Sequence, residues 1–265
     1  MTPGTPVFRK LGKLAPRIDA RTLKFENYLD PKALPPEPRG VQWSKWGKAW
    51  GMMLNDSLGD CVIAAGGHGT QVLTAAESNG TNEITVPDAA ILKGYEDVGG
   101  YKPNQPATDN GCVILDFLNY WRNTGLGGYK IGAFVQVNYH DHYQMRLAQA
   151  LFGGVFLGIQ LPLTAQTQID AGQWWGYVKG AGANGVPGSW GGHGIWAPDF
   201  DMAYKVPSMT IITWSALQKL TYPFVDAYTD EAWAILAPFW FNANQVAPNG
   251  FNMAALQADL ALVAA

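Results

Sequence analysis

The chain has 265 residues, of which 48% are hydrophobic and 15% are charged, and its formal net charge is −3. This length suits one large domain or two small ones with a substantial core. The weak negative charge, without a basic cluster, gives no support for nucleic-acid binding, and no apolar run reaches the roughly 20 residues of a membrane span. Two cysteines, Cys61 and Cys112, are too few for a disulfide framework.

The first 40 residues are rich in Pro, Lys and Arg and show no sustained periodicity. The stretch "LDPKALPPEPRG" is typical of an extended, polyproline-like conformation. We therefore predict an N-terminal arm over 1–40 that wraps over its own domain or a neighbouring chain, and that could hold protein assembly partners. The opening residues lack the apolar segment of a secretory signal, so we expect no signal peptide and leave a cytoplasmic or a virion-associated location open.

Three helices are predicted in the first half of the chain. Small and apolar residues over 61–77 indicate a buried helix with close packing at its glycines. Pro87 and Asp88 open a second helix that ends at the glycines after Val98. The stretch "TDNGCVILDFLNYWRNTGLGG" contains the third helix, which has one apolar side and a glycine stop.

Beyond residue 128 the pattern changes to short alternating or apolar segments, which are typical of strands. A Gly- and Trp-rich stretch over 171–192 is expected to be a loop. Helices first and a mostly antiparallel sheet second predict an α+β fold. Strands are expected at 129–137, 154–161, 193–201, 208–214 and 231–237, and further helices at 141–154 and 250–263.

Cys61 stands at the start of a predicted helix, directly after the turn-rich "NDSLGD". A helix N-terminus lowers the pKa of a thiol through its dipole and its free N–H groups, and the thiolate is the nucleophile. Its general base must be a histidine close in space. His68 lies about 10 Å further along the same helix, which is too far. His140 and His142 flank Asp141 without a third metal-binding residue nearby, so we interpret them as helix-start polar residues and expect no metal or cofactor.

His193 lies between glycines in "GSWGGHGIWAPDF", at the start of a predicted strand. Glycines on both sides allow backbone or substrate to approach closely. A histidine at the start of a strand can be purely structural. Together with a helix-start cysteine, we interpret His193 as the general base that serves Cys61.

The stretch "VQWSKWGKAWGMMLNDSLGDC" resembles the start of papain-like cysteine peptidases. In that family a Trp is followed four residues later by a Gly, and a Gln and a Gly stand six and two residues before the nucleophile. Trp43, Gly47, Gly59 and Cys61 hold these places, and Asn55 takes the place of the Gln. "NGCVILDFLNYWRNTGLGG" resembles the Cys-Asn-Gly-Gly segment of the family, and "GGHGIW" resembles its histidine strand. The arm and the C-terminal segment are most similar to uncharacterised papain-like proteins of phages and prophages.

The resemblance covers about 41–236. It implies a papain-like domain over 41–240, with a helical left lobe, an antiparallel β-rich right lobe and a cleft between them. The arm (1–40) precedes this domain, and a segment over 241–265 with an amphipathic helix follows it. Leu58 replaces the cysteine that forms a disulfide in the family, so we expect Cys112 to be a buried, inert thiol.

The resemblance also implies the site residues. The side-chain amide of Asn55 would donate to the oxyanion, although it is one methylene shorter than that of the Gln. The asparagine that orients the family's histidine aligns with Ile212. Thr213, Asp199 or Asp201 are the candidates for orienting the ring of His193 instead.

Two classes of function follow. The first is a thiol hydrolase of peptide or other amide bonds, in which Cys61 attacks and His193 moves the proton; transfer to another acceptor by the same pair is a variant of it. The second is a non-catalytic structural or binding protein, such as a virion or surface component attached through its arm. The intact Cys61, His193 and Asn55 favour the enzyme, and the low charge and the lost asparagine favour the second class.

Overall fold

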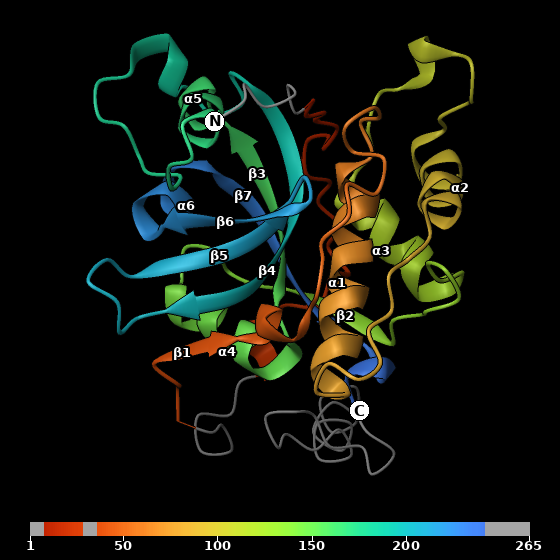
Figure 1. Cartoon of the computed structure of the whole chain (residues 1–265), viewed down its shortest axis with the longest axis horizontal. Coiled ribbons are helices and arrows are strands. Elements are labelled where there is room, and N and C mark those ends of the chain that lie inside the picture. The colour runs from red at the N-terminus through yellow and green to blue at the C-terminus, as the bar shows by residue number, and fades with distance from the viewer. Residues whose placement is uncertain (1–7, 29–35, 242–265) are drawn as a thin grey trace.

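The computed structural model describes residues 8–28 and 36–241. Figure 1 shows an antiparallel sheet on one side and a group of helices on the other, in agreement with the predicted α+β fold. The helices are α1 (Cys61–Glu77), α2 (Asp88–Gly99), α3 (Ile114–Asn123), α4 (His142–Phe152), α5 (Leu163–Asp170) and α6 (Tyr222–Tyr228). The strands are β1 (Gly40–Gln42), β2 (Ala133–Gln136), β3 (Val155–Leu161), β4 (Gly191–Asp201), β5 (Ser208–Thr213), β6 (Ala216–Thr221) and β7 (Thr229–Leu236).

The strands of the described part of the chain form one sheet in the order β2-β7-β3-β4-β5-β6, and β1 pairs with β4. Helices α1, α2 and α3 lie on one side of this sheet, and α5 and α6 lie on its other side (Figure 1). Side chains alternate between the two faces along a strand, so neighbours on β4 join different cores. Trp196 belongs to the core against the helices, whereas Ile195 and Ala197 belong to the core on the opposite face.

The predicted elements agree with the structure in order but not in every boundary. The first three helices are present, and the predicted loop 171–192 contains the short 3₁₀ helix Gly182–Gly185 and, at its end, the first two residues of β4. The strand predicted over 129–137 is shorter in the structure, where only β2 (Ala133–Gln136) is extended. Strands β1 and β6 and helices α5 and α6 were not anticipated. The predicted helix over 250–263 lies outside the described residues.

α1 is the central helix, and its side chains from Cys61 to Ala76 are buried. Its glycines allow close packing, because a Cβ on Gly69 would lie 2.8 Å from Cε3 of Trp196 on β4. A Cβ on Gly66 would lie 2.3 Å from the Phe117 ring of α3. This packing holds α1 against β4 on one side and against α3 on the other. Within the described ranges, no helix combines the length and apolar character that crossing a membrane requires.

A larger side chain on this face of α1 should separate the helix from the sheet. We expect Gly69→Val to lower the free energy of unfolding by about 1–3 kcal/mol or more, because the extra methyl groups must displace Trp196. Urea denaturation measures the change. Gly176→Val is the control, since the nearest atom to a Cβ there is 3.8 Å away. Equal stabilities of the two variants would contradict the packing described for α1.

Candidate active site

The thiol of Cys61 lies at the first residue of α1, and only 1% of the residue is exposed. The chain reaches this helix through a tight turn in which Met53 and Leu54 both have positive φ angles. Asn55 closes the turn, because its Nδ2 donates a 3.0 Å hydrogen bond to the backbone oxygen of Leu58. The first N–H groups of a helix have no partner within the helix, so the N–H of Cys61 is suited to stabilise a negative charge.

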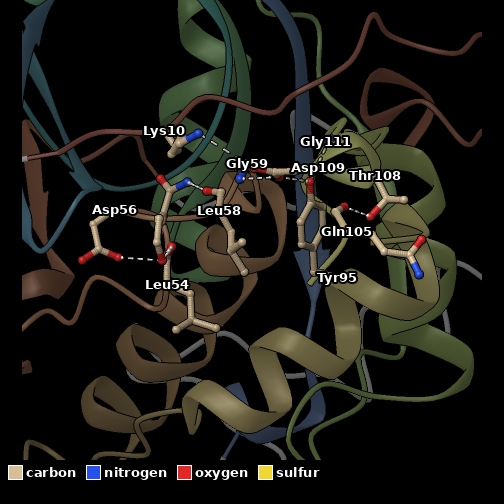
Figure 2. Close-up of polar contacts among 12 residues, drawn as sticks. Lys10, Leu54, Asp56, Leu58, Gly59, Tyr95, Gln105, Thr108, Asp109 and Gly111 are labelled. Atoms are coloured by element: carbon tan, nitrogen blue, oxygen red, sulfur yellow. Dashed lines mark hydrogen bonds and ion pairs between the residues drawn. The ribbon is translucent and has the colours of Figure 1, made fainter. Parts of the chain in front are cut away.

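A carboxylate on a second loop holds the turn before Cys61 in place, as Figure 2 shows. The Oδ1 atom of Asp109 accepts hydrogen bonds from the Gly59 N–H at 2.8 Å and from the Tyr95 hydroxyl at 2.7 Å. The hydroxyl of Tyr95 accepts in turn from the Gly111 N–H at 2.8 Å. This network joins the nucleophile loop to 109–111, and it was not anticipated from the sequence.

His193 lies on β4, the strand that contacts Cys61. The N–H of Gly194, the following residue, donates to the sulfur of Cys61 over 3.3 Å. A Cβ on Gly194 would lie 3.0 Å from a methyl group of Val62, so a larger residue would move the strand away from the helix. The structure thus brings the thiol of Cys61 into contact with the backbone of β4 at the residue that follows His193.

Thr213 and Trp214 fix the ring of His193. Its Nε2 atom forms a 2.7 Å hydrogen bond with the Thr213 hydroxyl, and its Nδ1 atom is buried without a hydrogen-bond partner. With the proton on Nε2, the ring donates to Thr213 and keeps Nδ1 as an acceptor. The indole of Trp214 stacks on the imidazole with ring centroids 4.2 Å apart. Trp214 has a φ of 42°, a strained backbone for a non-glycine residue.

The other candidates for orienting the ring are engaged elsewhere. Asp199 accepts hydrogen bonds from the N–H and the hydroxyl of Ser44. Asp201 accepts from the backbone N–H groups of Ala203 and Tyr204 at 2.8 and 3.0 Å. Ile212, at the position of the missing asparagine, belongs to the apolar core.

Residues 9–14 of the arm, here called the crossing segment, lie between the helices and the sheet, in the red part of the trace in Figure 1. On the helical side, the N–H of Cys112 donates to the Gly12 oxygen at 2.8 Å, and the N–H of Leu14 donates to the Cys112 oxygen at 3.0 Å. On the sheet side, the N–H of Lys13 donates to the Gly192 oxygen at 3.1 Å. The crossing segment therefore binds both to the helical side and to β4, and the space that it fills between them is here called the groove.

The crossing segment also contacts the nucleophile loop. A Cβ on Gly12 would lie 1.7 Å from the backbone oxygen of Gly59, so only glycine fits there. The N–H of Lys10 donates to the backbone oxygen of Asn55 at 3.0 Å, and the indole N–H of Trp214 donates to the Lys10 oxygen at 3.1 Å. This part of the arm covers its own domain.

Burial keeps both members of the pair uncharged in this closed arrangement. Burial raises the pKa of the Cys61 thiol to about 12, although the N–H groups of Gly194 and Gly12 act in the opposite direction. Burial lowers the pKa of His193 to about 3, with a smaller contribution from His68. The thiol of Cys61 and the imidazole of His193 are therefore both neutral near pH 7.

Asp60, the residue before the nucleophile, is fully buried. Burial raises the pKa of its carboxyl group well above the usual range, and the Asn55 side chain opposes part of that rise. The hydrogen bond of Asn55 closes its own turn, and among the described residues neither carboxyl oxygen of Asp60 has a hydrogen-bond partner. Its role as an oxyanion donor remains a proposal.

The remaining histidines and the second cysteine have other surroundings. The Nε2 atom of His68 shares a 2.9 Å hydrogen bond with the Gly51 oxygen, and burial lowers the pKa of His68 to about 4. His142 pairs with Asp226 at 2.6 Å. In the described ranges, no three His, Cys, Asp or Glu side chains form a group that could hold a metal ion. Cys112 is buried and free, as predicted.

No family model and no curated protein matches this chain. Solved structures of cysteine proteases do. Xylellain, a cysteine protease from Xylella fastidiosa, has 13% identity and a TM-score of 0.61 over 89% of this chain and 99% of its own. Procathepsin B S9 from Trypanosoma congolense has 10% identity and a TM-score of 0.57 over 86% of each chain. Digestive procathepsin L 3 of Tenebrio molitor has 10% identity and a TM-score of 0.55 over 87% of this chain and 76% of its own. The fold is therefore papain-like.

The buried carboxyl group of Asp60 predicts a pH-dependent stability. A carboxyl group whose pKa is raised by folding favours the folded state below its unfolded pKa of about 3.9 and progressively less as the pH rises through the folded pKa. We expect Asp60→Asn to raise the urea midpoint at pH 8 and to change it little near pH 4. Asp56→Asn, at an exposed neighbouring position, is the control. A difference that does not grow with pH would contradict the assignment.

Proposed function

We propose that the chain is a papain-like thiol hydrolase of peptide or other amide bonds, with Cys61 as nucleophile and His193 as general base. The observation that carries the proposal is the hydrogen bond from the Gly194 N–H to the Cys61 sulfur. It supports the proposal because a helix-start thiol contacts the strand directly after His193, whose Nε2 atom bonds Thr213. The papain-like fold of the cysteine proteases named above supports the same class of reaction.

The reaction follows from these positions. His193 Nδ1 accepts the thiol proton, and the thiolate of Cys61 attacks the carbonyl carbon of the amide. The N–H of Cys61 and the amide of Asn55 stabilise the resulting oxyanion. The carbon–nitrogen bond then breaks, His193 returns the proton to the leaving amine, and a thioester remains on Cys61. His193 next takes a proton from water, whose oxygen attacks the thioester, and the acid and the thiol are released.

The crossing segment makes the described state a closed one. It binds both walls of the groove with backbone hydrogen bonds, and it contributes to the burial that keeps the pair uncharged. We propose that a substrate reaches Cys61 only after this segment has left the groove. Removal of the crossing segment would expose the Cys61 thiol to water. Because burial raises the pKa of this thiol, its exposure would lower that pKa.

The second candidate is a non-catalytic papain-like protein, such as a virion or surface component attached through its arm. The closed groove and the neutral pair favour it, because neither needs to change for a purely structural role. Its attachment element would be formed by parts of 1–40 other than the crossing segment, which is bound to its own domain. Displacing the crossing segment tests which of the two candidate functions is correct.

Gly12→Val should open the groove, because a side chain at this position collides with Gly59. We expect Cys61 in this variant to react with iodoacetamide at pH 7 at least about tenfold faster than in the natural chain, and hydrolysis of a fluorescent casein to appear. Peptide mapping by mass spectrometry measures the labelling. Ile18→Ala, at an exposed arm position, is the control. Casein hydrolysis that persists after Cys61→Ala is added would refute the nucleophile. If Cys61 in the opened chain is labelled freely but casein is not hydrolysed, the result would favour the non-catalytic candidate.

Thr213 is proposed as a positioning residue for His193. In the opened chain, Thr213→Val should lower kcat/KM by about 10- to 100-fold, because the ring loses the partner of its Nε2 atom. Thr213→Ser keeps the hydroxyl group and should retain most of the activity. The pH dependence of kcat/KM distinguishes positioning from a stability effect. Only a change in positioning shifts the part of the pH profile that reports the pKa of His193. Equal activities of the Val and Ser variants would remove Thr213 from the mechanism.

A further inference from the structure

The side chain of Lys13 in the crossing segment is a buried cation. It is 0% exposed, and its Nζ atom lies 2.8 Å from Asp230 Oδ2 and 3.1 Å from Glu231 Oε1. The same Nζ atom donates to the backbone oxygen of Leu14 at 3.1 Å. A buried ammonium group is costly unless it is paired and hydrogen-bonded, so the surroundings must be suited to a positive charge.

The pocket around this ammonium group belongs to the sheet and not to the arm. Asp230 and Glu231 stand at the start of β7, and Gly158 on β3 pairs with Glu231. Gln160 Nε2 donates to Asp230 Oδ2 at 2.7 Å, and the indole N–H of Trp233 donates to Glu231 Oε2 at 2.8 Å. Each of these hydrogen bonds holds one carboxylate oxygen and does not involve Lys13. The two adjacent carboxylates are therefore suited to a cation.

Two glycines make room for Lys13, one for its side chain and one for its backbone. A Cβ on Gly158 would lie 2.1 Å from Cε of Lys13, and a Cβ on Gly192 would lie 2.1 Å from its backbone oxygen. The pocket is next to the nucleophile, because Gly12, the neighbour of Lys13, contacts the loop before Cys61. In a peptide bound along the groove, one residue would face Cys61. The side chain of the residue next to it would enter this pocket.

We propose that the pocket formed by Gly158, Gln160, Asp230 and Glu231 is a subsite for a basic side chain, and that the substrates are peptides with Lys or Arg next to the residue that lies at Cys61. In the closed chain, Lys13 occupies this subsite. The substrate assignment rests on the proposed function, whereas the selectivity of the pocket for a cation does not. A neutral side chain would leave the buried Glu231 and the half-buried Asp230 without a counter-charge, and an acidic one would add a third negative charge.

The first test uses the full chain and needs no turnover. Lys13→Met removes the charge and keeps a long stem, and Lys13→Arg keeps the charge. We expect Cys61 in Lys13→Met to react with iodoacetamide at least about tenfold faster than in the natural chain, because a charge-assisted interaction that holds the crossing segment is lost. Lys13→Arg should stay within a few-fold of the natural chain. Leu14→Ala, at an exposed neighbouring position, is the control. Equal labelling of the Met variant and the natural chain would overturn the proposal.

The second test measures substrate choice in the Gly12→Val chain. The substrates are quenched fluorescent peptides that differ only in having Lys, norleucine or Glu on either side of a central glycine. We expect kcat/KM for the lysine peptide to exceed that for the norleucine peptide by roughly tenfold or more, and the glutamate peptide to be the poorest. Asp230→Asn and Glu231→Gln should each lower the ratio of lysine to norleucine. In Glu231→Gln, the indole N–H of Trp233 keeps an oxygen atom as its hydrogen-bond acceptor.

The outcomes separate the two claims. A ratio of one, or a preference for norleucine, would overturn the basic subsite while the hydrolase stands. If no peptide is cleaved although Cys61 is labelled freely, the hydrolase fails, and the labelling of Lys13→Met against Lys13→Arg decides whether the pocket selects a cation.

Discussion

The contact between the start of α1 and β4 is the constraint on which the site depends. The Gly194 N–H reaches the Cys61 sulfur only because glycines on both elements remove side chains from their interface. Gly69 allows Trp196 to pack on the helix, and Asp109 holds the loop that enters it. Cys61 is thus positioned by core packing and by a hydrogen-bond network, while His193 is positioned by a strand. Any change that separates helix and sheet would also break the contact between the thiol and β4.

The crossing segment complements the groove in two independent ways. Its backbone binds both walls, and the absence of a side chain at Gly12 lets it approach the nucleophile loop. Its one buried charge, on Lys13, meets the two carboxylates at the start of β7. The first feature determines where the chain runs, and the second determines which side chain is accepted beside it. Closure and substrate choice would therefore depend on the same surface.

Much of the fold could be predicted from the sequence, because the patterns of 61–77 and 193–201 are local. Strand β6 was missed, since it follows a turn in which Trp214 and Ser215 have positive φ angles without glycine. The sequence left Thr213 and Asp199 as alternatives for orienting His193; the hydrogen bond between β4 and β5 that distinguishes them is a tertiary contact. The Lys13–Asp230 pair joins residues 217 positions apart, and no local sequence pattern predicts it.

The central claim is that Cys61 and His193 act as one ionising pair once the groove is open. The most direct measurement is the pH dependence of the alkylation rate of Cys61 in Gly12→Val and in Gly12→Val with His193→Ala. The account predicts that the imidazole stabilises the thiolate, so the apparent pKa of Cys61 lies well below the free-thiol value of about 8.5 with His193 and moves towards that value without it. The same apparent pKa in both chains would contradict the pair.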